Sequence, residues 1–345
     1  MKLVLVTGGA GFFGGLLKQR LLAEGYRCVS VDLQRDEATH PNLEAVQGDL
    51  RDAAFLDGLA GRSRFDAIFH CAAILAHAVK DSKFLWSCNV EGTRAVAELA
   101  RRSKIPKLVF ISSNCLWGGA LGRAITEEEP PAPMEIYGRS KWEAEKVLHE
   151  YRGHLDISVI RTPTIMDAGR LGLLAILFEF IDEGRKVWVV GDGRQRYQFV
   201  YAQDLASACI LSLDNAGSDV FNVGSENVKT TREVYEHVIR MAESRARVAS
   251  LPKAPTLLAM KLAHLLKVSP LGPYQYRMIA EDFIFDTSKI RRKLGWRATL
   301  TNEEMLWKAF NYYRAHRDEI RNRKDVSAHR QAAPMGIIRI LKWLS

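Results

Sequence analysis

The chain of 345 residues is 47% hydrophobic and 26% charged, a composition typical of a globular protein with a large core. Its five scattered cysteines form no CxxC pair, which argues against a disulfide framework or a metal site and favours a reducing compartment. The formal net charge is +9, but residues 314–345 hold eight Lys or Arg against three acids, so we expect a local anionic contact and no nucleic-acid-binding surface.

The N-terminal run Lys2–Thr7 is apolar, but glycines follow it at once, so it predicts a buried strand and not a signal peptide. No apolar run reaches the ~18 residues that a membrane-spanning helix needs. Further expected strands are Arg27–Asp32, Leu43–Gly48, Ala67–Cys71, Lys107–Ser112 and Ile157–Arg161, and the expected helices between them include Phe13–Glu24, Phe84–Arg102 and Tyr137–Tyr151. Buried strands that alternate with helices predict an α/β fold with a doubly wound parallel sheet.

After Arg161 the alternation becomes irregular. The expected elements there are strands at Phe199–Tyr201 and Asp219–Val223 and helices at Asp204–Leu213, Thr231–Glu243, Pro252–Pro273 and Leu306–His316. We predict a sheet domain over 1–161, to which some later segments return, and a smaller, mainly helical C-terminal substrate lobe over 162–318. A basic linker and an amphipathic C-terminal helix are expected over 319–345.

The stretch VTGGAGFFG connects the first strand to the first helix. It satisfies GxGxxG from Gly9 and TGxxGxxG from Gly8, with Gly11 and Gly14 shared by both patterns. Glycines here permit a tight turn and a close approach to a pyrophosphate, which binds amide groups at the helix N-terminus. The pattern therefore predicts a Rossmann-type dinucleotide-binding domain, and the alternative is a tight turn without a ligand.

Asp32 ends the second strand, where an acid binds the ribose hydroxyls of a dinucleotide. Its carboxylate would repel a 2′-phosphate, so we expect NAD rather than NADP. Arg35, three residues later, keeps NADP open as the less favoured cofactor.

The stretch YGRSK places Tyr137 and Lys141 four residues apart, on one face of a helix. A phenol has a reference pKa of about 10 and is a poor base at neutral pH. A neighbouring ammonium and a positively charged nicotinamide ring favour the phenolate, so the pair is suited to acid/base chemistry. An exposed helix pair without a function is the alternative.

Two serines end the fifth strand, in the stretch FISSNCLWG. Ligands of open α/β sheets bind outside the carboxyl ends of the strands. Ser112 and Ser113 therefore lie where a hydroxyl could hydrogen-bond a substrate oxygen, although strand-end serines also cap local backbone.

Together these motifs resemble the extended short-chain dehydrogenase/reductase family, the NAD-dependent epimerase/dehydratases. The resemblance covers about residues 1–316 and includes TGGAGFFG, GDL, HCAA, NVEGT, SSNCLWG, YGRSK and the stretch from Gly191 to Ala206. It implies that Tyr137 is the catalytic acid/base, that Lys141 anchors the nicotinamide ribose and tunes Tyr137, and that Ser113 holds the substrate hydroxyl. The implied cofactor-binding residues are Gly8, Gly11, Phe12, Phe13, Gly14, Asp32, Asp49, Leu50, Ala72, Ala73, Asn89, Tyr137, Lys141 and Pro163.

The resemblance implies hydride transfer from the carbon of a secondary alcohol to NAD. A sugar epimerase returns the hydride to the other face and so inverts the configuration of that carbon, whereas a dehydrogenase releases the reduced cofactor. Asn114 and Cys115 stand where sugar 4,6-dehydratases carry an Asp-Glu pair, which disfavours water elimination. Relatives also tend to carry an Arg that grips the nucleotide diphosphate where this chain has Tyr197. The candidate substrate-binding residues are Asn114, Thr164, Arg194, Arg196 and Tyr197, and either arginine could equally be a solvated loop charge.

The C-terminal half carries two apolar, cationic stretches. Leu251–Pro270 resembles the membrane-facing members of the superfamily, with a buried hydrophobic helix as the alternative. Residues 334–345, PMGIIRILKWLS, are too short to span a bilayer but fit a helix lying in the headgroup layer. Packing on a partner subunit is the alternative for this tail.

The leading hypothesis is an NAD-dependent sugar epimerase, with a 4-epimerase favoured, that acts on a nucleotide- or polyprenyl-diphosphate-linked sugar through a transient keto intermediate. A 3β-hydroxysteroid- or sterol-type dehydrogenase is the alternative, and a non-catalytic NAD-binding scaffold is disfavoured because Ser113, Tyr137 and Lys141 are all present. We expect a cytoplasmic protein, with contact to the inner face of the membrane if the tail binds lipid. The resemblance also suggests a homodimer through the helices Phe84–Arg102 and Tyr137–Tyr151.

Overall fold

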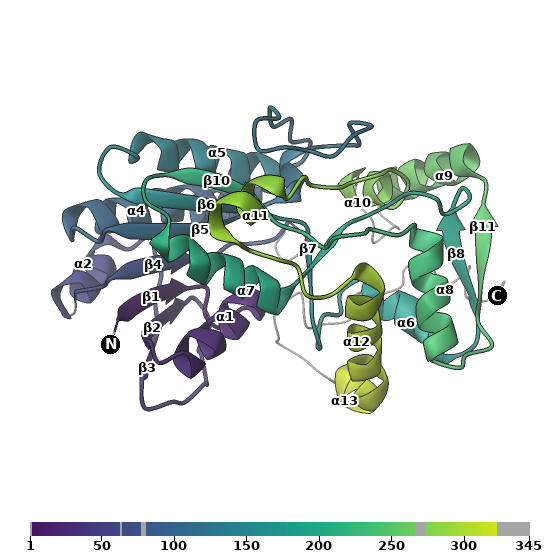
Figure 1. Cartoon of the computed structure of the whole chain (residues 1–345), viewed down its shortest axis with the longest axis horizontal. Helices are drawn as coiled ribbons and strands as arrows, with labels where there is room; N and C mark the ends of the chain where they lie inside the picture. Colours follow the sequence, from purple (N-terminus) through teal and green to yellow (C-terminus); the bar gives the residue numbers. More distant parts are fainter. Residues whose placement is uncertain (1, 63, 77–80, 267–272, 323–345) are drawn as a thin grey trace.

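The computed structural model describes residues 2–62, 64–76, 81–266 and 273–322, and all structural statements below concern this part of the chain (Figure 1). The predicted C-terminal helix at 334–345 and most of the basic linker lie outside the described residues.

A seven-stranded sheet forms the centre of the N-terminal half (Figure 1). Its strand order is β10-β6-β5-β4-β1-β2-β3, and every neighbouring pair is parallel. The strands are β1 (Leu3–Thr7), β2 (Arg27–Asp32), β3 (Leu43–Gln47), β4 (Ala67–His70), β5 (Lys107–Ser113), β6 (Asp156–Thr162) and β10 (Asp219–Asn222). The predicted Rossmann-type doubly wound parallel sheet is confirmed.

Helices cover both faces of this sheet. One hydrophobic core packs the sheet against α1 (Phe12–Ala23), α7 (Ala202–Leu211) and α11 (Ser288–Leu294). The other packs it against α2 (Ala53–Arg62), α4 (Gly92–Arg102) and α5 (Ile136–Glu150). The inner strands β1, β4, β5 and β6 are therefore removed from water on both faces, which explains why they read as continuous apolar runs, whereas the edge strand β3 stays largely exposed.

The predicted helix Phe84–Arg102 is not one regular helix. It consists of α3 (Ser82–Trp86), a π-helical segment (Ser87–Glu91) and α4. Asp81 caps its start by accepting hydrogen bonds from the backbone N–H groups of Lys83 and Phe84. The π-helical turn inserts an extra residue into the helical register and carries Asn89, and such turns frequently occur at functional sites.

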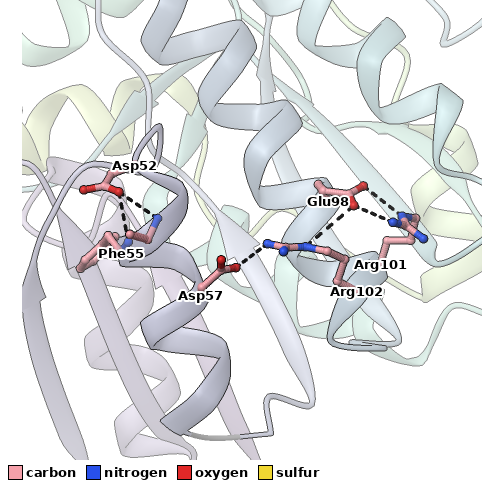
Figure 2. A network of polar contacts seen from close by, with 7 residues as sticks. Asp52, Phe55, Asp57, Glu98, Arg101 and Arg102 are labelled. Atoms are coloured by element: carbon pink, nitrogen blue, oxygen red, sulfur yellow. Dashed lines mark hydrogen bonds and ion pairs between the residues drawn. The ribbon is translucent and has the colours of Figure 1, made fainter.

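Exposed ion pairs link α2 and α4 on the outside of the sheet domain (Figure 2). Arg102 of α4 contacts Asp57 of α2 at 2.7 Å, and Arg101 contacts Glu98 within α4 at 2.6 Å. Because such pairs stay largely hydrated, they contribute little to the free energy of unfolding. The buried cores, rather than this network, hold the two helices on the sheet.

The C-terminal lobe is largely helical, as predicted, but it also contains small parallel sheets. Strand β8 (Lys186–Val190) pairs with β11 (Arg247–Leu251), and β7 (Thr164–Met166) pairs with β9 (Phe199–Tyr201). The helices of this lobe are α6 (Leu174–Asp182), α8 (Thr231–Met241), α9 (Lys253–Leu265), α10 (Pro273–Met278), α12 (Asn302–Ala315) and α13 (Arg317–Asn322). A separate core packs α6, α8 and α12 together.

The strand order reverses between β1 and β4, because the chain proceeds from β1 toward β2 and β3 and then returns to β4, β5 and β6 on the other side. The loops that leave the carboxyl ends of these strands diverge at this point, and ligands of doubly wound sheets bind in the crevice that such a reversal generally forms. Short 3₁₀ segments at Asn114–Leu116 and Ser212–Asp214 follow β5 and α7. The glycine turn, the loop after β4 and the end of β5 all lie at this edge of the sheet.

Candidate functional site

The glycine turn connects β1 to α1 in a conformation that side chains would block. Gly8 has a φ of +74°, and a Cβ there would lie 2.7 Å from the backbone nitrogen of Ala72. A Cβ at Gly14 would lie 2.1 Å from the carbonyl oxygen of Gly8. Helix α1 begins at Phe12, and its cap residue Gly11 supplies no side-chain hydrogen bond. The amide-rich N-terminus of α1 is thus presented to an anionic ligand.

Two charged residues clamp the peptide between Gly9 and Ala10. The ammonium of Lys18 donates to the carbonyl oxygen of Gly9 at 3.2 Å, and the N–H of Ala10 donates to the carboxylate of Asp32 at 3.1 Å. Lys18 is almost fully buried and also contacts Asp36. Asp32, one of the predicted cofactor residues, therefore lies directly against the turn, whereas Lys18 was not predicted.

Asp36 lies beneath the same turn. Its carboxylate accepts a hydrogen bond from Ser30 at 2.6 Å in addition to the contact with Lys18. Burial raises the pKa of Asp36, but the hydrogen bonds from Lys18 and Ser30 outweigh it and hold the pKa below its ordinary value. Asp36 is consequently ionised, and Lys18 has a full counter-charge.

Asp49 and Leu50, both predicted to flank the adenine, follow β3. The Asp49 carboxylate accepts from the Nε of Arg51 at 2.9 Å, and Leu50 packs against the core that holds α2, α4 and α5. Arg51 also donates to Ser87 at 3.1 Å and lies over the ring of Phe84, 4.9 Å from its centroid. This arginine, which was not predicted, joins the segment after β3 to the α3–α4 region.

A buried polar chain runs from β1 through His70 to the π-helical turn. His70 Nδ1 lies 2.7 Å from the hydroxyl of Thr7, and its Nε2 lies 2.9 Å from the hydroxyl of Thr93. Thr93 donates its own proton to the carbonyl oxygen of Asn89 at 2.7 Å, so His70 must donate from Nε2 and accept at Nδ1. Burial lowers the pKa of His70 to about 3, which keeps the ring neutral.

Asn89 ties the loop after β4 to the helix that carries Tyr137. Its amide oxygen accepts from the N–H of Ile74 at 2.7 Å, and its amide nitrogen donates to the carbonyl oxygen of Ile74 and to the hydroxyl of Ser140, both at 3.0 Å. Ser140 donates in turn to the carbonyl oxygen of Tyr137 at 2.8 Å. The loop that contains Ala72 and Ala73 is thereby held in register with α5.

Ser113 and Tyr137 meet at the carboxyl end of β5. Burial raises the pKa of the Tyr137 phenol, and a hydrogen bond from the Ser113 side chain acts against that rise. The Ser113 side chain therefore lies on the side of the phenol from which it favours the phenolate. Two of the three predicted catalytic side chains are thus neighbours at the end of β5.

Lys141 lies one helical turn after Tyr137, in an apolar setting. Its ammonium is 4.0 Å from the centroid of the Phe110 ring, and its side chain is almost completely buried. Burial lowers the pKa of Lys141 to about 7, with Glu145 acting in the opposite direction. The amine is therefore poised between its two protonation states near neutral pH.

Ser112, in contrast, is engaged in the support of the site. It donates to the carboxylate of Glu145 at 2.5 Å, and Glu145 forms a buried ion pair with Arg161 at 2.7 Å. Arg161 also donates to the carbonyl oxygen of Glu127 at 2.9 Å. These contacts bind β5, α5 and β6 together and leave Ser113 as the serine that faces the phenol.

Tyr197 joins two of the other predicted substrate residues. Its hydroxyl accepts from the amide of Asn114 at 3.0 Å and lies 2.9 Å from the hydroxyl of Thr164. Pro163, which precedes Thr164, connects β6 to β7. Three segments that are far apart in sequence thus converge beside the end of β5.

Arg170 enters the same region from the turn after β7 and was not predicted. Its Nε is buried without a hydrogen-bond partner in the described part of the chain. Burial lowers the pKa of Arg170 to about 10, with the phenols of Tyr197 and Tyr137 acting against it, and Arg170 in turn lowers the pKa of Tyr137. The guanidinium is therefore within electrostatic range of both phenols. A lone arginine in a turn gave no motif by which sequence reasoning could have found it.

The two predicted substrate arginines are not gathered with this cluster. Arg194 has a side chain 87% exposed and contacts Asp192 of the same turn at 3.8 Å. Arg196 contacts Asp282 at 3.5 Å and lines a cavity of about 340 Å³ with Gln198, Ser225 and Arg291. Because neighbours in an extended segment point to opposite sides, Arg196 faces away from the hydroxyl cluster that Tyr197 forms.

Comparison with known proteins gives consistent matches over most of the chain. An uncharacterised protein of Sinorhizobium fredii, y4nG, is 38% identical over 320 residues, which cover 92% of this chain and 80% of that protein. The UDP-glucose 4-epimerase of Mycolicibacterium smegmatis is 29% identical over 329 residues, which cover 90% of this chain and 98% of the relative.

Solved structures share the fold. The UDP-glucose 4-epimerase of Thermotoga maritima, with UDP-glucose, has a TM-score of 0.73 at 23% identity and covers 91% of this chain and 99% of its own. WbmG of Bordetella bronchiseptica, in complex with NAD, has a TM-score of 0.75 at 20% identity and covers 91% and 94%. The model of the NAD dependent epimerase/dehydratase family matches residues 4–224, which is more than half of the chain. The chain therefore belongs to the NAD-dependent epimerase/dehydratase family and is an enzyme with NAD as its cofactor.

Proposed function

We propose that this enzyme is a sugar epimerase, acting at C4 of a sugar linked to a nucleotide or polyprenyl diphosphate, and that the reaction passes through a transient 4-keto sugar. The observation that carries the proposal is that Ser113 and Tyr137 are neighbours at the carboxyl end of β5, where Ser113 lowers the pKa of the phenol against the effect of burial. We assign the phenol as the acid/base group and the serine as its hydrogen-bond donor, at the edge of the sheet where the glycine turn also lies. A relative with a described activity that spans nearly the whole chain is a UDP-glucose 4-epimerase.

The residues of the crevice fit a dinucleotide. The close approaches at Gly8 and Gly14 leave backbone where side chains would otherwise stand, and α1 presents its uncapped N-terminus there. We assign Gly8, Gly11, Phe12, Phe13 and Gly14 to the pyrophosphate side of NAD. The adenosine side would be held by Asp32, Asp49 and Leu50, and the nicotinamide side by Ala72, Ala73, Asn89, Lys141 and Pro163.

NAD, when bound, supplies the hydride acceptor and donor for the sugar carbon. Tyr137 takes the proton of the C4 hydroxyl during oxidation and returns one during reduction. Ser113 donates a hydrogen bond that holds the substrate oxygen and stabilises the phenolate. Lys141, in its protonated form, would donate hydrogen bonds to the ribose hydroxyls, add positive charge on the same helix face and favour the phenolate further.

An epimerase must also retain the keto sugar in its active site while the sugar ring rotates to present its other face to the cofactor. Asn114, Thr164 and Tyr197 offer a cluster of hydroxyl and amide groups beside the reacting centre, suited to the sugar hydroxyls. Arg170 contributes a cation in the same region, where relatives tend to place an arginine at the position of Tyr197. We assign Arg170 to an anionic oxygen group of the substrate, either the diphosphate or a carboxylate on the sugar. Arg194 and Arg196 remain candidates for binding the part of the nucleotide or polyprenyl carrier that lies farthest from the sugar.

Incubation of the NAD-loaded enzyme with UDP-glucose, followed by separation of the nucleotide sugars, tests the proposal. An epimerase yields a mixture of UDP-glucose and UDP-galactose without a net rise in absorbance at the NADH band. Stoichiometric NADH would identify a dehydrogenase instead. If UDP-glucose is inert, the same assay with polyprenyl-diphosphate-linked sugars shows whether the enzyme requires a sugar on a lipid carrier.

The tail at 334–345 is relevant to whether the sugar is carried by a nucleotide or by a lipid. We propose that it lies on the inner surface of the membrane and brings the enzyme to a lipid-linked substrate. We also propose that the enzyme is a cytoplasmic homodimer whose interface is formed by the α3–α4 region and α5. No helix in the described ranges is long and apolar enough to cross a membrane. Flotation with liposomes of the full chain and of a chain stopped at Ala333 tests the tail: equal partitioning of the two would exclude it as a membrane contact.

A further inference from the structure

Helix α9 lies at the periphery of the C-terminal lobe (Figure 1). It leaves large apolar side chains exposed to solvent. Leu258 is 59% exposed, Leu262 is 51% exposed and Leu265 is 75% exposed. Leu266, the residue after the helix, is 71% exposed. Scattered single leucines on a surface are ordinary, but four within nine residues form a continuous apolar patch.

These leucines share one side of the helix, because Leu262, Leu265 and Leu266 follow Leu258 at four, seven and eight residues. Buried Ala263 and the half-buried Thr256 and Met260 mark the side of α9 that packs against the protein. The apolar face therefore points away from the lobe. The alternative considered for this stretch, a buried hydrophobic helix, is wrong.

The segment of chain that carries α9 has charges of one sign. Residues 244–280 hold six Lys or Arg and no Asp or Glu. Lys253 begins α9, and Lys261 is an exposed residue that borders the leucine face. An apolar helical face bordered by basic side chains matches the apolar and anionic layers of a phospholipid surface.

We propose that the face of α9 formed by Leu258, Leu262, Leu265 and Leu266 binds the surface of an anionic phospholipid membrane. This inference deepens the proposed function, since it gives the enzyme a second lipid contact, separate from the tail, on the lobe that binds substrate. Membrane binding by α9 can be tested without the proposed function, but its purpose rests on that function: the enzyme would lie on the membrane that holds a lipid-linked substrate.

A second copy of the chain fits this face less well. In a two-fold symmetric interface the same patch meets itself, so the basic residues of one α9 would face those of the other. The absence of acids over residues 244–280 leaves nothing in this segment to neutralise them. Anionic lipid supplies the missing negative charge together with an apolar layer for the leucines.

Flotation of the NAD-loaded protein with vesicles tests the proposal. The vesicles are phosphatidylcholine alone or with about 30% phosphatidylglycerol. The test variant is the triple substitution Leu258→Gln, Leu262→Gln, Leu265→Gln, and the matched control is Met241→Gln, an apolar side chain 49% exposed on α8. The wild type and the control should float with the anionic vesicles, and the triple variant should bind at least about tenfold more weakly.

Two further experiments distinguish lipid binding by this face from lipid binding by the tail and from effects on catalysis. The triple substitution is repeated in the chain stopped at Ala333, where it should again weaken binding. Because the substituted side chains are exposed, turnover of a soluble nucleotide sugar and the melting temperature should not change, so a catalytic failure and a failure of lipid binding are observed independently. Lys261→Glu should weaken binding to anionic vesicles while having little effect with phosphatidylcholine alone.

Equal flotation of the wild type and the triple variant would overturn the proposal. It would also be overturned if the wild type ignored vesicles and the triple substitution instead converted a dimer to a monomer in analytical ultracentrifugation. In that case the leucine face would be an interface between two copies of the chain.

Discussion

The ammonium of Lys18 and the carboxylate of Asp36 form a buried ion pair directly beneath the glycine turn, and Lys18 also holds the carbonyl oxygen of Gly9 at 3.2 Å. The side chains of the pair are only 2% and 7% exposed. The N–H of the same Gly9–Ala10 peptide is bound by Asp32 at 3.1 Å. The part of the chain assigned to the NAD pyrophosphate is therefore fixed from below by the buried pair of Lys18 and Asp36, which has no assigned contact with the cofactor, and by Asp32.

Replacing Lys18 with Met should destabilise the protein and weaken NAD binding. The buried Asp36 would lose its counter-charge, which costs roughly 3 kcal/mol in the free energy of unfolding. The freed Gly9 carbonyl should loosen the turn and raise the dissociation constant for NAD about tenfold. Chemical denaturation and calorimetry measure the two effects.

The matched control for Lys18 is Arg20→Met on the same helix. Arg20 pairs with Glu24, but their side chains are 42% and 33% exposed, so the loss should stay near 0.5 kcal/mol. Rescue of NAD affinity by Lys18→Arg would support the clamp, because that change keeps the charge. Unchanged affinity in Lys18→Met would show that the turn holds its shape without the lysine.

Tyr137→Phe should abolish turnover while leaving NAD binding intact. The change removes the hydroxyl that exchanges a proton with the substrate but keeps the ring and its packing, so the rate should fall by about 10³-fold. Steady-state kinetics and cofactor calorimetry report the two properties separately, with Tyr26→Phe as a control at the turn between α1 and β2. Activity within a few fold of the wild type would remove Tyr137 from the mechanism.

Lys141 should make the stability of the cofactor-free protein depend on pH. Burial lowers its pKa from 10.5 to about 7, so between these values the unfolded chain binds a proton that the folded chain has released. Stability from this group therefore rises as the pH increases from about 7 toward 10.5. Lys141→Met removes the ionisable group and should raise the melting temperature more at pH 6 than at pH 10. An equal change at both pH values would contradict the assignment of a buried, depressed amine.

Arg170→Gln should weaken substrate binding rather than merely change the pH profile. If the guanidinium binds an anionic group, the KM should rise roughly 30-fold or more, Arg170→Lys should recover part of the loss, and the exposed Arg240→Gln should have no effect. Equal losses for UDP-glucose and UDP-glucuronate indicate the diphosphate, and a loss confined to UDP-glucuronate indicates a carboxylate on the sugar.

A competing role for Arg170 gives a different kinetic signature. Because Arg170 lowers the pKa of Tyr137, its removal by itself would shift the acidic limb of kcat to higher pH. That shift with an unchanged KM would mean that Arg170 tunes the phenol and binds no substrate group. A calorimetric titration of the NAD-loaded variant with UDP reports binding without requiring turnover.

The sequence predicted the parts of the molecule that depend on local pattern. The parallel sheet follows from apolar runs alternating with helices, and the turn around Gly8 and Gly14 follows from a spacing that only glycine satisfies. Tyr137 and Lys141 were visible because a helix brings residues four apart onto one face. In each case the chemistry is determined by neighbours in the chain.

The parts that were missed depend on long-range packing. Lys18 lies between Leu17 and Leu21 on a core-facing helix, and its partner Asp36 comes from a loop whose path no pattern specifies. Arg170 reaches the phenols only because β7 pairs with β9 beside the end of β5. The sequence left the exposure of α9 open, since its composition fits both a membrane-facing helix and a buried one.

The most direct measurement follows a deuterium label at C4 of the nucleotide sugar through one epimerisation. The account predicts that the label stays at C4 of the product and slows the reaction, because the hydrogen leaves and returns as a hydride held within the protein, while only the hydroxyl proton is exchanged through Tyr137. Loss of the label to water, with solvent hydrogen incorporated at C4, would contradict hydride chemistry and with it the proposed roles of Ser113, Tyr137 and Lys141.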